Sequence, residues 1–151
     1  MSLARVRTRA QLGLDAPAVT VEVHLSPGLP GLAIVGLPEA AVRESKDRVR
    51  SALINSGFEF PQRRITINLA PADLPKFGGR FDLPIALGIL AANGQLPVSA
   101  LQKAEFMGEL ALSGDLCPIP GVLPASLVAR DAGHALFVPL GNAGEAARPH
   151  G

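Results

Sequence analysis

The ten residues 83–92 read LPIALGILAA and contain no charged side chain. Asp82 before them and Gly94 after them favour a helix that begins with the aspartate as its N-terminal cap and ends at the glycine. A helix that is apolar nearly all round must be covered on almost every side. We therefore place this helix at the centre of the fold and expect the other elements to form layers around it.

Strands are predicted where apolar and polar residues alternate. Residues 18–25 (AVTVEVHL) place their valines on one face and their polar side chains on the other, which is typical of a strand with one solvated face. Further strands are predicted at residues 4–10, 32–35, 64–69, 104–112, 116–119 and 135–139, with the first three strands in an antiparallel meander. Helices over 38–55 and 123–132 complete an α/β (α+β) domain with a mixed sheet and packed helices.

Composition limits the classes of protein that the chain can belong to. The chain has 151 residues, of which 48% are hydrophobic and 18% charged, and this is typical of one folded domain. A single cysteine, Cys117, excludes a disulfide within the chain, and no cluster of metal ligands is evident. No apolar run reaches the ~18 residues of a membrane span, and the N-terminus lacks an apolar signal segment. We expect a cytoplasmic protein with no membrane partner.

A glycine-rich loop (APADLPKFGGR, residues 70–80) runs directly into the central helix. Lys76 and Arg80 flank its two glycines, and a helix N-terminus beside two cations suits a phosphate group. The alternative is a solvated loop in which the glycines only form the turn. The loop is not a Walker A motif, so we expect no ATP site in this chain.

Basic residues are concentrated in the middle of the sequence. Residues 43–80 contain eight basic and four acidic residues, a net charge of +4, whereas the whole chain has a net charge of +1. Arg43, Lys46 and Arg50 recur at helical spacing and share one face. This indicates either a nucleic-acid contact or an ordinary solvated helix face. The candidate DNA-binding residues are Lys76, Arg80, Arg63, Arg64, Lys46, Arg50 and Arg43.

Long runs of the sequence resemble a known family. VGLPEAAVRES, NLAPADLPKFGGRFDLPIALGIL and FMGELALSGDL are similar to the N-terminal domain of ComM-type proteins, also called YifB-like or magnesium-chelatase-like proteins. The resemblance covers residues 3–141. It implies a ribosomal protein S5 domain 2-like fold, which is also the fold of the Lon protease domain. It further implies a domain over 1–141, with 142–151 as a tail or the start of a linker to an AAA+ module.

The resemblance to Lon also bears on catalysis. Lon carries its catalytic serine in a K-D-G-P-S-A-G run, and alignment on Lys76 and Gly78 places Arg80 at the serine position. The same comparison places Leu123 at the position of Lon's catalytic lysine. Neither a guanidinium nor an alkyl chain can replace these groups, so we expect no peptidase activity and no catalytic residue.

The function that the resemblance implies is that of a larger protein. ComM-type proteins are hexameric AAA+ motors for DNA branch migration in natural transformation and recombination, and the parent protein would bind ATP and magnesium. This chain would be a non-catalytic accessory domain that binds no cofactor itself and contacts single-stranded or branched DNA. The alternative is an assembly module that packs against its own AAA+ module or neighbouring subunits of a homo-hexamer, without binding DNA.

Overall fold

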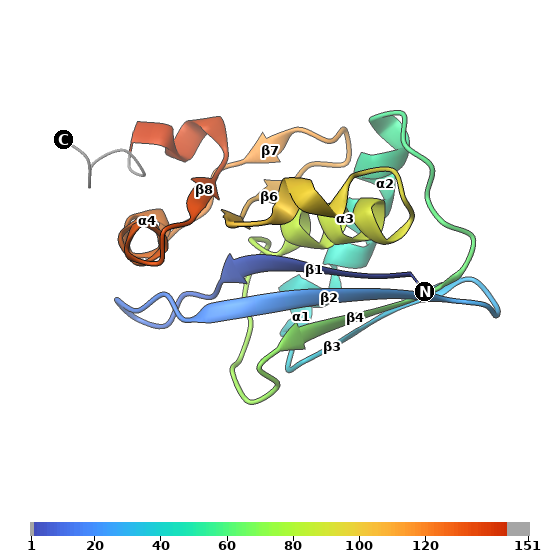
Figure 1. Cartoon of the computed structure of the whole chain (residues 1–151), viewed down its shortest axis with the longest axis horizontal. Helices are drawn as coiled ribbons and strands as arrows, with labels where there is room; N and C mark the ends of the chain where they lie inside the picture. The colour runs from blue at the N-terminus through green and yellow to red at the C-terminus, as the bar shows by residue number, and fades with distance from the viewer. Residues whose placement is uncertain (1, 145–151) are drawn as a thin grey trace.

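A six-stranded sheet forms the centre of the fold, in the strand order β3-β4-β2-β1-β5-β8 (Figure 1). The computed structural model describes residues 2–144. The strands are β1 (Ser2–Arg9), β2 (Ala18–Ser26), β3 (Gly31–Val35), β4 (Arg64–Ala70), β5 (Ala104–Phe106), β6 (Glu109–Leu110), β7 (Leu116–Cys117) and β8 (Ala135–Phe137). The helices are α1 (Ala40–Arg43), α2 (Ser45–Asn55), α3 (Asp82–Ala92), α4 (Val122–Asp131) and the short 3-10 helices η1 (Val98–Leu101) and η2 (Leu140–Asn142).

The sheet is mixed. β2 pairs in antiparallel fashion with β1 on one side and with β4 on the other, whereas β3–β4, β1–β5 and β5–β8 are parallel pairs. β6 and β7 form a separate antiparallel ribbon. The edges of the large sheet are therefore β3 and β8, and no strand of residues 2–144 pairs beyond either of them.

The central helix α3 packs directly on β1 and β2, as its composition predicts. Gly88 makes this close approach possible, because a Cβ atom at this position would lie 2.5 Å from a methyl carbon of Val23. Ile85 and Ile89 on the same helix are fully buried. Burial of a large aliphatic side chain stabilises a fold by about 1.5–3 kcal/mol, so this contact is a main source of stability. Helix α2 packs on α3 and completes the layer.

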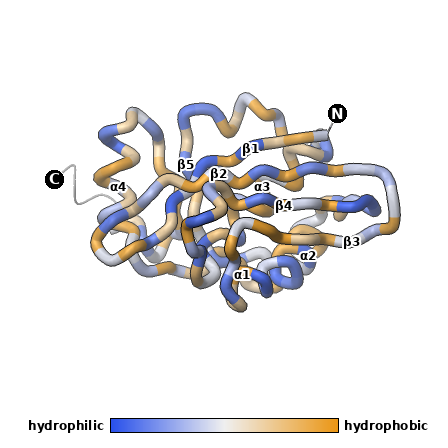
Figure 2. Tube along the Cα trace, turned by 90° about the horizontal axis from the view of Figure 1, so that it is seen from below, coloured by the Kyte–Doolittle hydropathy of each residue, from blue (hydrophilic) through white to orange (hydrophobic). Residues whose placement is uncertain are grey.

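The other face of β1, β2 and β4 carries polar side chains. Figure 2 shows hydrophilic and hydrophobic residues alternating along these strands. On this face Arg5 Nε lies 3.0 Å from Glu22 Oε2, and Asn68 Nδ2 donates to Glu22 Oε1 at 2.9 Å. The pKa of Glu22 is lowered, mainly by the Asn68 hydrogen bond and also by Arg5, although burial opposes the shift. The predicted division into a buried and a solvated face is confirmed.

The predicted antiparallel meander of the first three strands is wrong in its third member. β3 does not pair with β2, because β4 lies between them and pairs with β3 in parallel. Parallel neighbours need a crossover connection, and α1 and α2 form it. β4 also offers a longer apolar face than β3, since Ile65, Ile67 and Leu69 are all buried against the core.

Two predicted elements are each divided in two, and one predicted helix cap is wrong. The helix over 38–55 is divided into α1 and α2 at Glu44, and the strand over 104–112 is divided into β5 and β6. Phe81, not Asp82, holds the N-cap position of α3, and no side chain caps this helix end. Asp82 is fully buried and makes other hydrogen bonds, as described below.

A buried ionic cluster joins β1, β5 and the turn that precedes β8. Arg9 Nε and Nη2 donate to the two carboxylate oxygens of Glu105 at 2.7 and 3.0 Å, and His134 Nδ1 lies 2.7 Å from Glu105 Oε2.

Asn142, in the predicted tail 142–151, is buried and hydrogen-bonds the backbone N–H and C=O of Ile119. Residues 145–151 of that tail lie outside the described residues. Within residues 2–144, no helix is both long and apolar enough to cross a bilayer.

Candidate nucleic-acid interface

A basic pocket lies between α2 and the segment that leads into β4. It has a volume of about 340 Å³. Helix α2 contributes Lys46 and Arg50, which lie one turn apart on the same helix face, and Asp47, which lies three residues before Arg50. The remaining lining residues are Pro30, Gly31, Leu32, Phe60, Pro61 and Gln62. The pocket is thus formed by a charged helix face opposite two proline-containing turns.

Aromatic and backbone contacts hold the two sides of the pocket in place. The guanidinium carbon of Arg50 lies 5.6 Å from the centre of the Phe60 ring, a cation–π geometry that orients the arginine. The N–H of Gly31 donates to the C=O of Arg63, and Gly31 is the register partner of Arg64. The backbone of Arg63 and Arg64 therefore lies beside the pocket that contains Lys46 and Arg50, although neither side chain is among the lining residues.

All four of these basic side chains are exposed. Arg63 makes one long hydrogen bond, 3.3 Å from Nη1 to the hydroxyl of Ser2. Asp47 is the acidic residue of the pocket lining, so the cations outnumber the carboxylate. An exposed cluster of this kind attracts a phosphate backbone with an affinity that falls as salt rises.

Arg43 is separated from this cluster. It lies at the end of α1, before the break at Glu44, and is not among the residues that line the pocket. Its Nε donates to the C=O of Pro38 at 3.3 Å, and its side chain is exposed. The helical spacing that grouped Arg43 with Lys46 and Arg50 therefore does not put it in the same site.

Lys76 is not available to a phosphate, which corrects the expectation from the glycine-rich loop. Its side chain is fully buried. Its Nζ donates to the C=O groups of Gly36, at 2.6 Å, and Pro71. Burial lowers the pKa of Lys76, an effect that the charge of Asp73 partly opposes. The lysine ties the loop to the turn after β3 and is a structural residue in this conformation.

Arg80, the second cation of that loop, is also turned inward, with only 4% of its surface exposed. Its Nη2 donates to the sulfur of Met107 at 3.4 Å, while Nε and Nη1 have no hydrogen-bond partner among the described residues. Burial lowers the pKa of Arg80 to about 10. Arg80 is therefore still charged at neutral pH but cannot reach a DNA backbone on the surface, so the expected phosphate-binding loop is not formed.

Residues 21–142 match the family described as Subunit ChlI of Mg-chelatase, which accounts for most of the chain. The chain belongs to the ChlI family.

The relatives of this ChlI-family chain are longer proteins. It is 59% identical over 145 residues to YifB of Salmonella typhimurium, a match that covers 96% of the chain and 29% of the relative. The chain is 59% identical over 146 residues to the competence protein ComM of Haemophilus influenzae. This match covers 97% of the chain and 29% of ComM. The Lon protease of Mycoplasma mobile is 28% identical to the chain over 133 residues. This match covers 82% of the chain and 16% of the protease. The chain thus spans less than a third of these relatives.

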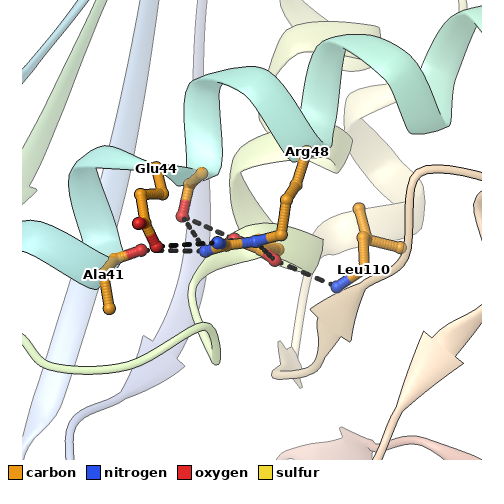
Figure 3. Close-up of polar contacts among 6 residues, drawn as sticks. Ala41, Glu44, Arg48 and Leu110 are labelled. Atoms are coloured by element: carbon orange, nitrogen blue, oxygen red, sulfur yellow. Dashed lines mark hydrogen bonds and ion pairs between the residues drawn. The ribbon is translucent and has the colours of Figure 1, made fainter.

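The ChlI-family domain also contains a polar network that sequence reasoning missed (Figure 3). Asp82 accepts hydrogen bonds from the Ser45 hydroxyl at 2.5 Å, from the backbone N–H of Leu110 at 3.0 Å and from Arg48. Arg48 Nη2 also donates to the C=O of Ala41 at 2.8 Å. Hydrogen bonding to Asp82 is the main reason that the pKa of Arg48 is raised. This arginine is therefore committed to the interior and does not belong to the basic surface.

Only one sign in the sequence pointed to this network. Asp82 is a charged residue at the start of an otherwise apolar helix, and such a residue needs a buried partner unless it caps the helix. Residues 2–144 contain no group of three or more His, Cys, Asp or Glu side chains arranged to hold a metal ion.

Proposed function

We propose that this chain is a non-catalytic accessory domain of a larger AAA+ ATPase related to ComM, and that it contacts DNA through its basic pocket. The proposed contacts are Lys46 and Arg50 on α2, with Arg63 and Arg64 beside them. The proposed domain comprises residues 1–141 with a ribosomal protein S5 domain 2-like fold. The mixed sheet and the similarity to Lon support that fold assignment.

The observation that carries the proposal is the basic pocket itself. Lys46 and Arg50 line one hollow from the same helix, the backbone of Arg63 and Arg64 adjoins it, and all four side chains are exposed. Exposed, convergent lysines and arginines are suited to phosphate contacts, which do not depend on a specific base. We therefore propose a backbone contact with single-stranded or branched DNA that does not depend on sequence.

The motor activity would belong to the rest of the protein. ComM carries competence in its name, and we propose that the protein of which this chain is part acts in natural transformation as an ATP-driven, hexameric branch-migration enzyme. ATP and Mg²⁺ would bind outside this chain. The loop before α3 does not fit a nucleotide phosphate, because its lysine and arginine are both buried.

We also propose that the domain has no peptidase activity. Arg80 and Leu123 stand where the comparison with Lon places the serine and the lysine of the protease. The loop 77–80 and the segment 118–120 do line one cavity, so the two regions of a Lon-like site are adjacent. A nucleophile and a base are nevertheless missing from the two aligned positions.

The proposal is tested by fluorescence anisotropy with labelled single-stranded, duplex and branched DNA over a range of salt concentrations. A Lys46→Ala/Arg50→Ala variant removes two proposed contacts. We expect weaker binding to all DNA sequences and a decrease of about 2 in the slope of log K against log salt, because each phosphate neutralised by the protein contributes about 1 to that slope.

A charge-matched control removes two cations from the opposite edge of the sheet. Lys103→Ala/Arg130→Ala changes the net charge equally, at the residue before β5 and in α4. This control is expected to keep the wild-type salt slope. Equal decreases in affinity in both variants would show a nonspecific charge effect and would exclude the pocket as the DNA-binding surface.

An assembly role is the second candidate, and an apolar groove supports it. Leu53, Leu83 and Leu87 line a cavity of about 240 Å³ between α2 and α3, and Phe58 at its rim is exposed. Sedimentation of the ATPase-containing protein with and without residues 1–141 tests this role. Loss of the hexamer on deletion, together with no DNA binding by the domain, would favour assembly over DNA contact.

A further inference from the structure

A second cavity, of about 310 Å³, lies on the side of the glycine-rich loop that faces the β6–β7 ribbon. Its volume is at the lower end of the range for small-molecule sites. Its lining residues are Gln11, Phe77, Gly78, Gly79, Arg80, Glu109, Pro118, Ile119 and Pro120. Phe77 and the proline-containing segment give it apolar walls, and Arg80 and Glu109 give it one charge of each sign.

Arg80 is the unusual member of this lining. It is almost completely buried, and its Nε and Nη1 make no hydrogen bond to any described residue. A buried charged group with only one weak sulfur acceptor is strongly unfavourable, so natural structures pair such groups or bind an ion beside them. A guanidinium cannot escape this cost by losing its proton near neutral pH.

Glu109 does not supply the missing partner. Within residues 2–144 no ion pair or hydrogen bond joins its carboxylate to Arg80. The carboxylate lies instead over Gly79, where an added Cβ atom would be 2.1 Å from Oε1. The cavity therefore presents a cation and an anion that are not paired with each other.

We propose that this cavity binds a small amino-acid-like zwitterion, with the ligand's carboxylate on Arg80 and its ammonium group toward Glu109. These nitrogens are closed to solvent in this structure, so the Arg80 side chain must turn toward the cavity for a carboxylate oxygen to accept from them in a charge-assisted hydrogen bond. The apolar body of the ligand contacts Phe77 and Ile119. Gly78 also lines the cavity, and no atom lies within 4 Å of the position that its Cβ would take. This site is separate from the basic pocket and does not depend on the proposed DNA contact.

The test uses the whole chain with L-leucine as the zwitterion and acetate as a ligand that carries the carboxylate alone. Leucine at ten times its Kd is expected to raise Tm by about 3–6 °C. Acetate is expected to give a smaller rise. Arg80→Met should abolish both responses, and Glu109→Gln should reduce the leucine response to that of acetate. Arg43→Ala, which removes an exposed arginine outside both proposed sites, should respond as the wild type does.

A measurement on the wild type keeps the test independent of variant folding. The NMR resonance of the Arg80 Nε–H group is expected to shift on titration with leucine. An unchanged resonance, or equal Tm shifts in the wild type and Arg80→Met, would overturn the proposal. Equal responses to leucine and acetate would overturn the role given to Glu109.

Discussion

Arg48 and Asp82 are joined by two hydrogen bonds, of 2.7 Å from Nε to Oδ2 and 3.1 Å from Nη2 to Oδ1. The aspartate is fully buried, whereas 21% of the arginine side chain is exposed. The pair connects α2 to the first turn of α3, and the Leu110 N–H extends the connection to the β6–β7 ribbon. Three elements that are distant in sequence are thus held by one carboxylate.

Replacement of Arg48 should destabilise the domain strongly. Arg48→Ala leaves the Asp82 carboxylate buried without its cation, and loss of one partner of a buried pair costs about 3–5 kcal/mol. Urea unfolding followed by circular dichroism measures the change. Arg43→Ala is the matched control, because Arg43 is exposed and should change the free energy of unfolding by less than about 0.5 kcal/mol. Equal stabilities of the two variants would contradict the structural role of the pair.

Replacement of Lys76 and replacement of Lys46 should have opposite effects on stability and on DNA binding. Lys76→Met removes hydrogen bonds to two backbone carbonyl groups and should lower the free energy of unfolding by about 1–3 kcal/mol without affecting DNA binding. Lys46→Met should leave stability within about 0.5 kcal/mol of the wild type but weaken DNA binding. Both quantities are measured for both variants, by urea unfolding and anisotropy. A weakened salt dependence in a folded Lys76→Met variant would restore the loop as a DNA contact.

Gly36 cannot accept a side chain. Its φ angle is +105°, and a Cβ atom there would lie 2.2 Å from the backbone oxygen of Leu69. Gly36→Ala must therefore push β4 away from the turn after β3, and we expect a decrease in the free energy of unfolding of about 3 kcal/mol or more. Gly31→Ala has open space and should be tolerated. Comparison of the two urea midpoints tests this, and a stable Gly36→Ala variant would show that the turn is not closely packed.

Glu22 should contribute stability that depends on pH. Its pKa in the folded state is below the ordinary value of 4.5, so the unfolded chain binds a proton first as the pH falls. The stabilisation is therefore complete above about pH 4.5 and is lost as the pH falls through the folded-state pKa. The difference in urea midpoint between the wild type and Glu22→Gln should shrink from pH 6 to pH 3. A difference that does not change with pH would contradict this assignment.

Much of the fold follows from local patterns in the sequence. The alternation over residues 18–25 predicted both the strand β2 and its buried valines, and the apolar run over 83–92 predicted the central helix. Pairing partners were harder to predict, because the position of β4 between β2 and β3 depends on a crossover that no local pattern specifies. The break at Glu44 was also missed, since the helical spacing of the basic residues continues across it.

The candidate site could be predicted only in part, for the same reason. Helical spacing grouped Lys46 with Arg50, and the structure places both in one pocket. The loop pattern gave no indication that Lys76 and Arg80 turn inward, because the direction of a loop side chain is set by distant partners such as the Gly36 carbonyl and Met107. The position of Phe60 beneath Arg50 likewise depends on tertiary packing.

The positions of β3 and β8 at opposite edges of the sheet have a consequence for how the domain can be used. Five strand spacings separate these edges, which amounts to roughly 24 Å at about 4.8 Å per strand. The basic pocket adjoins β3, whereas η2 follows β8. A tether attached beyond β8 and a ligand held beside β3 would therefore not compete for space, and the rigid sheet between them would act as a spacer of fixed length.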